Sequence, residues 1–114
     1  NPLQKGSSLV LWAETDSGAL LGGDAIGELG KPSEKVGREA ANNLLKEIAT
    51  RATVDSHLAD MLVPYAALAQ GNSAYLSGFV TEHLDTNIWL AEKILGTKFQ
   101  VTRVENLYKI ETAK

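Results

Sequence analysis

The two histidines, His57 and His83, are the side chains best suited to nucleophilic or acid–base chemistry in this sequence. The chain has no cysteine, which excludes disulfides, thiolate metal sites and a cysteine nucleophile. The histidines lack the paired spacing of a zinc motif, and no G-x-S-x-G elbow is present. The glycines between residues 22 and 30 match neither a P-loop nor a dinucleotide fingerprint, so we interpret them as turn residues.

His83 falls in the first turn of a predicted helix that Thr81 can cap. Unpaired backbone amides and the helix dipole attract anions there, and they disfavour the imidazolium form. A neutral imidazole beside an anion-binding helix terminus is suited to attack on a phosphate. By spacing alone, an ordinary surface histidine is the more frequent outcome. Asn87, one turn further on, is placed to hydrogen-bond the ring or a phosphate oxygen, or simply to be solvated.

Asp60 is a third candidate ligand residue. It could bind magnesium or a ribose hydroxyl, although a surface helix acid is the commoner reading of such a residue. His57 and Asp60 lie at i and i+3 of one predicted helix, so both could point into one pocket. We interpret Trp12 and Trp89 as core or interface anchors, because neither is flanked by basic residues.

The helix that carries Asp60 is expected to begin at a cap, Asp55 or Ser56, and to end before Gly71. Pro64 has no amide hydrogen, so the carbonyl of Asp60 should lose its helical partner and the helix should kink there. The buried side of this helix is predicted from a stripe of apolar residues: Leu58, Met61, Leu62, Tyr65, Leu68 and Ala69.

The other elements follow from periodicity and turn residues. Residues 8–15 and 19–26 predict a β-hairpin, in which Gly22 and Gly23 indicate a bulge or a close backbone approach. A helix is predicted from Pro32 to about Thr50. Its polar face is expected to be solvated and comprises Lys35, Arg38, Glu39, Asn42, Lys46 and Glu47.

A strand is expected over residues 73–80, a third helix from about residue 82 to Leu95, and strands over 98–104 and 107–111. The order ββααβαββ predicts an α+β fold, a mixed sheet with helices packed on one face. A net charge of −3 provides no general attraction for RNA, so cations for RNA binding must come from elsewhere. No apolar run reaches the length of a membrane span, and we expect a cytoplasmic protein.

Three ordered segments resemble the RNA 3'-terminal phosphate cyclases. Residues 6–14 with 27–37 (GSSLVLWAE and GELGKPSEKVG) are similar to that family's hairpin and the start of its helix. Residues 54–69 (VDSHLADMLVPYAALA) resemble its V-D-x-H/Y-L-A-D-Q-L-x-P-x-A-L-A segment, and residues 81–90 (TEHLDTNIWL) resemble its histidine motif. The resemblance implies a fold of βαβαββ repeats. It also implies ATP-dependent conversion of an RNA 3'-phosphate end to a 2',3'-cyclic phosphate.

By this resemblance His83 would be the nucleophile that accepts AMP from ATP, with Mg²⁺ or Mn²⁺ accompanying the nucleotide. Asp60 would line the nucleotide or metal site, and His57 would stack on adenine. Met61 departs from the family's glutamine, which puts a ribose or base contact in doubt. The presence of His83 argues against the family's non-catalytic branch. A non-catalytic RNA-processing or ribosome-assembly scaffold stays the alternative, with a structural domain related to the carboxyvinyl transferases as a third reading.

The sequence opens on Asn1 and Pro2 without an initiator methionine, so we expect it to begin inside a longer polypeptide. The resemblance implies that residues 1–114 form a single C-terminal fragment of a larger cyclase. It implies further that the N-terminal part and the inserted domain lie upstream and are absent. The isolated fragment is then expected to be inactive and to need the remainder of the same polypeptide as its partner.

Overall fold

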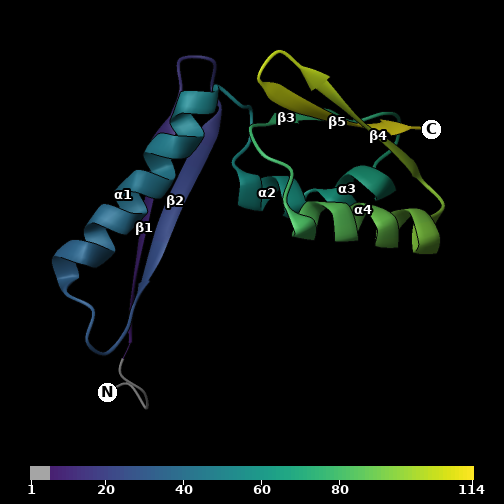
Figure 1. Ribbon diagram of the computed structural model, residues 1–114. Coiled ribbons are helices and arrows are strands. Elements are labelled where there is room, and N and C mark those ends of the chain that lie inside the picture. Colours follow the sequence, from purple (N-terminus) through teal and green to yellow (C-terminus); the bar gives the residue numbers. More distant parts are fainter. Residues whose placement is uncertain (1–5) are drawn as a thin grey trace. The chain divides into compact units, whose positions relative to one another are not determined.

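The computed structural model describes residues 6–114 and divides the chain into two compact units, residues 1–49 and residues 50–114 (Figure 1). We call them unit 1 and unit 2 and describe each by itself. The expectation about Asn1 and Pro2 lies outside the described residues. Within residues 6–114, no helix combines the length and apolar character that crossing a bilayer requires.

Unit 1 is a β-hairpin with one long helix against it (Figure 1). Strands β1 (Ser7–Glu14) and β2 (Leu20–Gly27) pair antiparallel without a break in register. The turn closes through Thr15, whose amide donates to the Ala19 carbonyl at 2.8 Å. Helix α1 (Ser33–Thr50) covers one face of the hairpin. The small core between them consists of Leu9, Leu11, Ala25, Val36 and Ala40.

Gly23 lets α1 lie directly on β2. A Cβ atom at this position would stand 2.4 Å from the Leu44 amide nitrogen and 2.8 Å from the Ala40 carbonyl oxygen. The unbroken register excludes a bulge within the hairpin. Of the two interpretations of the paired glycines, the close backbone approach is therefore confirmed for Gly23.

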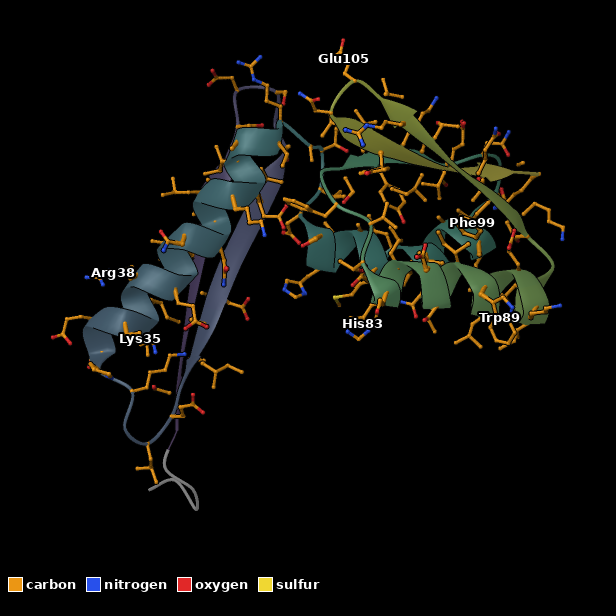
Figure 2. All side chains as sticks on the ribbon, viewed as in Figure 1. Lys35, Arg38, His83, Trp89, Phe99 and Glu105 are labelled. Atoms are coloured by element: carbon orange, nitrogen blue, oxygen red, sulfur yellow. The ribbon has the colours of Figure 1, made fainter. Side chains whose placement is uncertain are left out.

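Unit 2 is a three-stranded antiparallel sheet with helices on one face (Figure 1). Its strand order is β3 (Ala74–Ser77), β5 (Leu107–Ala113), β4 (Lys98–Val104). The helices are α2 (Ser56–Met61), α3 (Val63–Leu68) and α4 (Glu82–Leu95). The buried core between sheet and helices comprises Val63, Ala67, Leu84, Ala91 and Ile110, and Phe99 packs against it from β4 (Figure 2).

The α+β class and the order of elements are confirmed, with the kinked second helix counted once. The prediction of a single mixed sheet is wrong, because the strands in residues 6–114 form two separate sheets with antiparallel pairing. Strand β3 ends at Ser77, earlier than expected, since the Ser77 hydroxyl bonds both backbone groups of Phe79 and turns the chain. Glu47 is buried rather than solvated.

Candidate functional site

Helix α4 begins at a well-formed cap next to His83. Thr81 has extended backbone angles, φ −93° and ψ 163°, and its hydroxyl accepts a hydrogen bond from the Leu84 amide at 3.1 Å. His83 is the second residue of the helix and is exposed. Figure 2 shows its side chain pointing away from the three-stranded sheet. The structure thus places the predicted nucleophile in solvent at a capped helix N-terminus.

The neighbouring helix breaks at the predicted place. Asp55 caps α2 by accepting from the Leu58 amide at 2.8 Å, and α2 ends at Met61. Pro64 stands at the start of α3 and cannot donate to the carbonyl of Asp60. The side chain of Asn87 from α4 takes the missing place, with Nδ2 donating to that carbonyl at 3.0 Å. The kink is confirmed, and a different helix supplies the lost hydrogen bond.

The carboxylate of Asp60 is buried, with 8% of the residue exposed, and is bound to the cap of α4. Its Oδ1 atom accepts a hydrogen bond from the Thr81 hydroxyl at 2.8 Å. Asp60 therefore receives two hydrogen bonds from the α4 region, one on its side chain and one on its backbone. A part-buried hydrogen bond to a carboxylate contributes more to stability than an exposed ion pair, because water competes less for it.

Tyr75 of β3 completes this cluster. Its hydroxyl donates to the carbonyl of Ala59 at 2.8 Å, one residue before Asp60. Burial raises the pKa of Tyr75 from 10.0 to about 12, and the negative charge of Asp60 contributes to this rise as the smaller cause. The phenol is therefore protonated at neutral pH and remains a donor. Two successive carbonyls at the helix break are thus satisfied by side chains from other elements.

A cavity of about 300 Å³ opens between α2, α3 and α4. Its wall is mainly apolar and comprises Asp60, Met61, Pro64, Asn87, Leu90, Ala91, Ile94 and Leu95. The structure thus brings together Asp60 and Asn87, two of the predicted ligand residues. Met61, which stands in place of the family's glutamine, lines the same cavity. His57 and His83 are exposed and do not line this cavity. His57 is the second residue of α2, on a helix that buries Asp60.

A metal site is not complete within residues 6–114. No group of three or more acidic or histidine side chains comes together among them. Asp60 offers a carboxylate, but one oxygen already accepts from Thr81. The described residues therefore do not fit a resident divalent ion by themselves.

Sequence reasoning identified the kink and the cap but not the partners that join them. Thr81 was predicted as an N-cap without a link to Asp60, and the acceptor for Asn87 was not predicted. The orphan carbonyl created by Pro64 was the available signal, since a buried carbonyl must find a donor elsewhere. Nothing in the sequence indicated Tyr75 as one such donor.

The first 49 residues match the family model described as the insert domain of RNA 3'-terminal phosphate cyclase. The matched range coincides with unit 1. This disagrees with the expectation of one undivided fragment that lacks the inserted domain. Spacing within residues 1–49 suited the family's hairpin, but the sequence did not reveal that a unit boundary follows.

Relatives match both units. The chain is 50% identical over 109 residues to the RNA 3'-terminal phosphate cyclase of Pyrobaculum neutrophilum. The matched stretch covers 96% of the chain and 31% of that protein. It is 50% identical over 99 residues to the cyclase of Thermococcus onnurineus, covering 87% of the chain and 28% of the relative. Over 108 residues it is 43% identical to the cyclase of Methanosarcina barkeri, covering 95% of the chain and 31% of the relative.

The chain belongs to the RNA 3'-terminal phosphate cyclase family. It spans about a third of the length of the curated relatives it matches.

Proposed function

We propose that the full-length protein containing this chain converts an RNA 3'-terminal phosphate to a 2',3'-cyclic phosphate at the expense of ATP. The support is the set of relatives named RNA 3'-terminal phosphate cyclase, which match the chain over nearly its whole length. The observation that carries the proposal is the position of His83, exposed in the first turn of a capped helix within the matched part.

His83 is the proposed nucleophile. An unprotonated imidazole nitrogen attacks the α-phosphorus of ATP, a P–N bond forms, and pyrophosphate leaves with the electrons of the broken P–O bond. The free amides of the α4 N-terminus stabilise the negative charge on the phosphate oxygens. Exposure of His83 leaves the approach to the imidazole open.

Two transfers follow in the proposed reaction. The RNA 3'-phosphate attacks the phosphorus of the histidine-bound AMP, which releases the imidazole and forms an RNA–AMP anhydride. The neighbouring 2'-hydroxyl then attacks the terminal RNA phosphorus, loses its proton, and expels AMP. A phosphoramidate is a suitable intermediate because the histidine leaves readily once it is protonated.

The remaining predicted residues serve nucleotide binding in this proposal. The exposed ring of His57 stacks on adenine, and Asp60 and Asn87 line one wall of the site. Nδ2 of Asn87 is engaged with Asp60, so its contact with the nucleotide is made through the amide oxygen or the second N–H. Mg²⁺ or Mn²⁺ arrives with ATP and neutralises phosphate charge, and residues outside this chain complete its coordination.

The test is adenylation of the full-length protein with α-labelled ATP and Mg²⁺, followed by mapping of the modified peptide. The wild type should carry one AMP on His83, and His83→Ala should carry none. His57→Ala is the matched histidine control. It should form the adduct at saturating ATP but with a higher KM, because it removes stacking and leaves the nucleophile in place.

Wild-type protein that binds ATP without forming the adduct would overturn the proposal and favour a non-catalytic scaffold. Label on a residue other than His83 would overturn the assignment of the nucleophile. The isolated chain of residues 1–114 is expected to form no adduct, because two thirds of the relatives' length lies outside it.

A further inference from the structure

We propose that Thr81 is a positioning residue for His83, and that it acts by tying the N-terminus of α4 to the buried carboxylate of Asp60. This inference rests on the proposed function, since it concerns the adenylation of His83. It assigns to Asp60 a role in holding the nucleophile that is separate from any contact with the nucleotide.

The hydroxyl of Thr81 makes two directed hydrogen bonds. It donates its proton to Oδ1 of Asp60 at 2.8 Å and accepts from the Leu84 amide at 3.1 Å. A hydroxyl has one proton, so donation to the carboxylate leaves only its lone pairs for the helix amide. The negative charge of Asp60 therefore sets the direction of the cap as well as strengthening it.

The link joins segments that are distant in sequence. Thr81 and Asp60 are 21 residues apart, and Asn87 and Asp60 are 27 residues apart. The first bond holds the cap of α4, and the second, nearly two turns along the same helix, holds its body to the Asp60 carbonyl. Two attachment points on one residue fix both the position of the α4 N-terminus and its rotation about the helix axis.

His83 lies between these two attachment points. The buried Leu84 follows it directly, and 0% of Leu84 is exposed, so the backbone of this turn is anchored by packing as well as by hydrogen bonds. His83 itself is exposed, so the core does not bury its imidazole. Its direction therefore depends on the backbone of the first turn, which the Thr81–Asp60 bond defines.

Loss of this bond should affect the chemical step more than ATP binding. In-line attack requires a defined distance and angle between the imidazole and the α-phosphorus, and a misplacement of about 1 Å can cost about 100-fold in rate. Thr81→Val keeps the shape of the side chain but removes both hydrogen bonds. We expect kcat for His83 adenylation to fall by about 30-fold, with KM for ATP changed by less than about threefold.

The experiment measures single-turnover adenylation of the full-length protein at several ATP concentrations. Thr81→Ser restores the hydroxyl and should return kcat to within about threefold of wild type. Thr102→Val on β4 is the matched control, because it is the same substitution in the same unit, and it should leave kcat unchanged. Thermal melts establish that each variant is folded at the assay temperature.

Thr81→Asp separates the cap from the link. An aspartate accepts well from the helix amide, but it cannot donate to Asp60 and places a like charge beside it. We expect its kcat to fall at least as far as that of Thr81→Val. This variant keeps the proposal testable even where valine weakens the helix.

Three results would overturn the inference. They are wild-type kcat in Thr81→Val or Thr81→Asp, a slow Thr81→Ser variant, and a change confined to KM. A wild-type protein that forms no adduct on His83 would instead remove the proposed function, and this inference with it. The two failures are therefore distinguished by the wild-type measurement alone.

Discussion

Unit 1 and unit 2 are each stabilised internally by a different kind of contact. In unit 1, α1 packs on the hairpin through small apolar side chains and through the missing side chain of Gly23. In unit 2, an apolar core is joined to a buried set of polar contacts around Asp60. Both units combine helix and antiparallel sheet, so the difference does not come from fold class.

Two polar contacts of unit 1 lie at or near its surface. Asn43 donates to the Asp24 carbonyl at 2.9 Å, and the contact is exposed. Lys31 forms an ion pair with Glu39 at 2.6 Å, and the two side chains are 12% and 44% exposed. Because the glutamate is in contact with solvent, water and salt screen the pair, and its contribution to stability is on the order of 1 kcal/mol. Unit 1 therefore depends mainly on the fit of its backbone and small residues.

The polar contacts of unit 2 fix orientation. Asp60, Thr81 and Asn87 join α2 to α4 through two hydrogen bonds that are partly removed from water. Such contacts are directional, whereas apolar packing tolerates small rotations of a helix. The unit that contains the candidate nucleophile is therefore also the unit in which hydrogen bonds define the rotation of α4 relative to α2.

The largest expected effect is a loss of stability in unit 1. Gly23→Ala places a Cβ atom 2.4 Å from the Leu44 amide nitrogen, so β2 and α1 must separate. We expect a loss of about 3 kcal/mol in the stability of unit 1. Gly37→Ala is the control. That glycine lies within α1 with open space around it, and alanine should stabilise the helix by about 0.5–1 kcal/mol.

The stability of unit 1 in the Gly23→Ala and Gly37→Ala variants is measured by hydrogen exchange of the full-length protein, resolved peptide by peptide. Gly23→Ala should speed exchange over residues 20–27 and 33–50, and Gly37→Ala should slow it over 33–50. Unchanged protection in Gly23→Ala would show that the close approach of α1 to β2 does not stabilise unit 1.

An intermediate effect tests the polar contacts of unit 2. Asn87→Ala leaves the carbonyl of Asp60 without its donor and should cost about 1–3 kcal/mol. Pro64→Ala restores a backbone N–H that can donate to the same carbonyl. The cost of Asn87→Ala should therefore shrink in the Pro64→Ala background, measured as a double-mutant cycle from exchange rates in α4. Simple additivity of the two substitutions would contradict this account of the helix break.

The smallest effect concerns Tyr75 and depends on pH. The pKa of this phenol is about 12 in the folded protein and about 10 when unfolded, so the native state keeps its proton longer. The stabilisation is fully present below pH 10 and is lost as the pH rises through 12. Tyr75→Phe removes the bond to Ala59 and should cost about 1 kcal/mol at neutral pH.

Thermal melts of the full-length wild type and Tyr75→Phe between pH 7 and pH 12 measure this dependence. The difference in melting temperature between wild type and Tyr75→Phe should decrease from pH 10 upward. A difference that stays constant over this range would show that the Tyr75 hydroxyl is not buried against Ala59.

Much of the local structure could be predicted because its determinants are neighbours in sequence. The hairpin has turn residues between two apolar runs, and Asp55 and Thr81 cap helices through amides three residues away. Gly96 ends α4 in the left-handed region, φ 73°, as its position after the last apolar residue indicates. Each of these signals acts within one turn of chain.

The arrangement of strands could not be predicted in the same way. A single mixed sheet was expected, but in the part of the chain that the structure describes β1 and β2 form a two-stranded sheet of their own, and β3 pairs with β5. Strand periodicity identifies which residues share a face and does not identify the partner strand. The boundary between the two units was missed for a similar reason. It falls at the end of α1, and helical periodicity shows where a helix ends but not which surfaces pack together beyond it.

The sequence by itself determined the elements, their caps, the kink at Pro64 and the placement of His83 at a helix N-terminus. Only the tertiary structure decided which groups meet at Asp60, because Thr81 and Asn87 are 21 and 27 residues away. It also decided that Glu47, on the polar side of α1 by periodicity, is buried. Local hydrogen bonds and periodicity act over a few residues, whereas burial and long-range pairing depend on which surfaces the folded chain brings together.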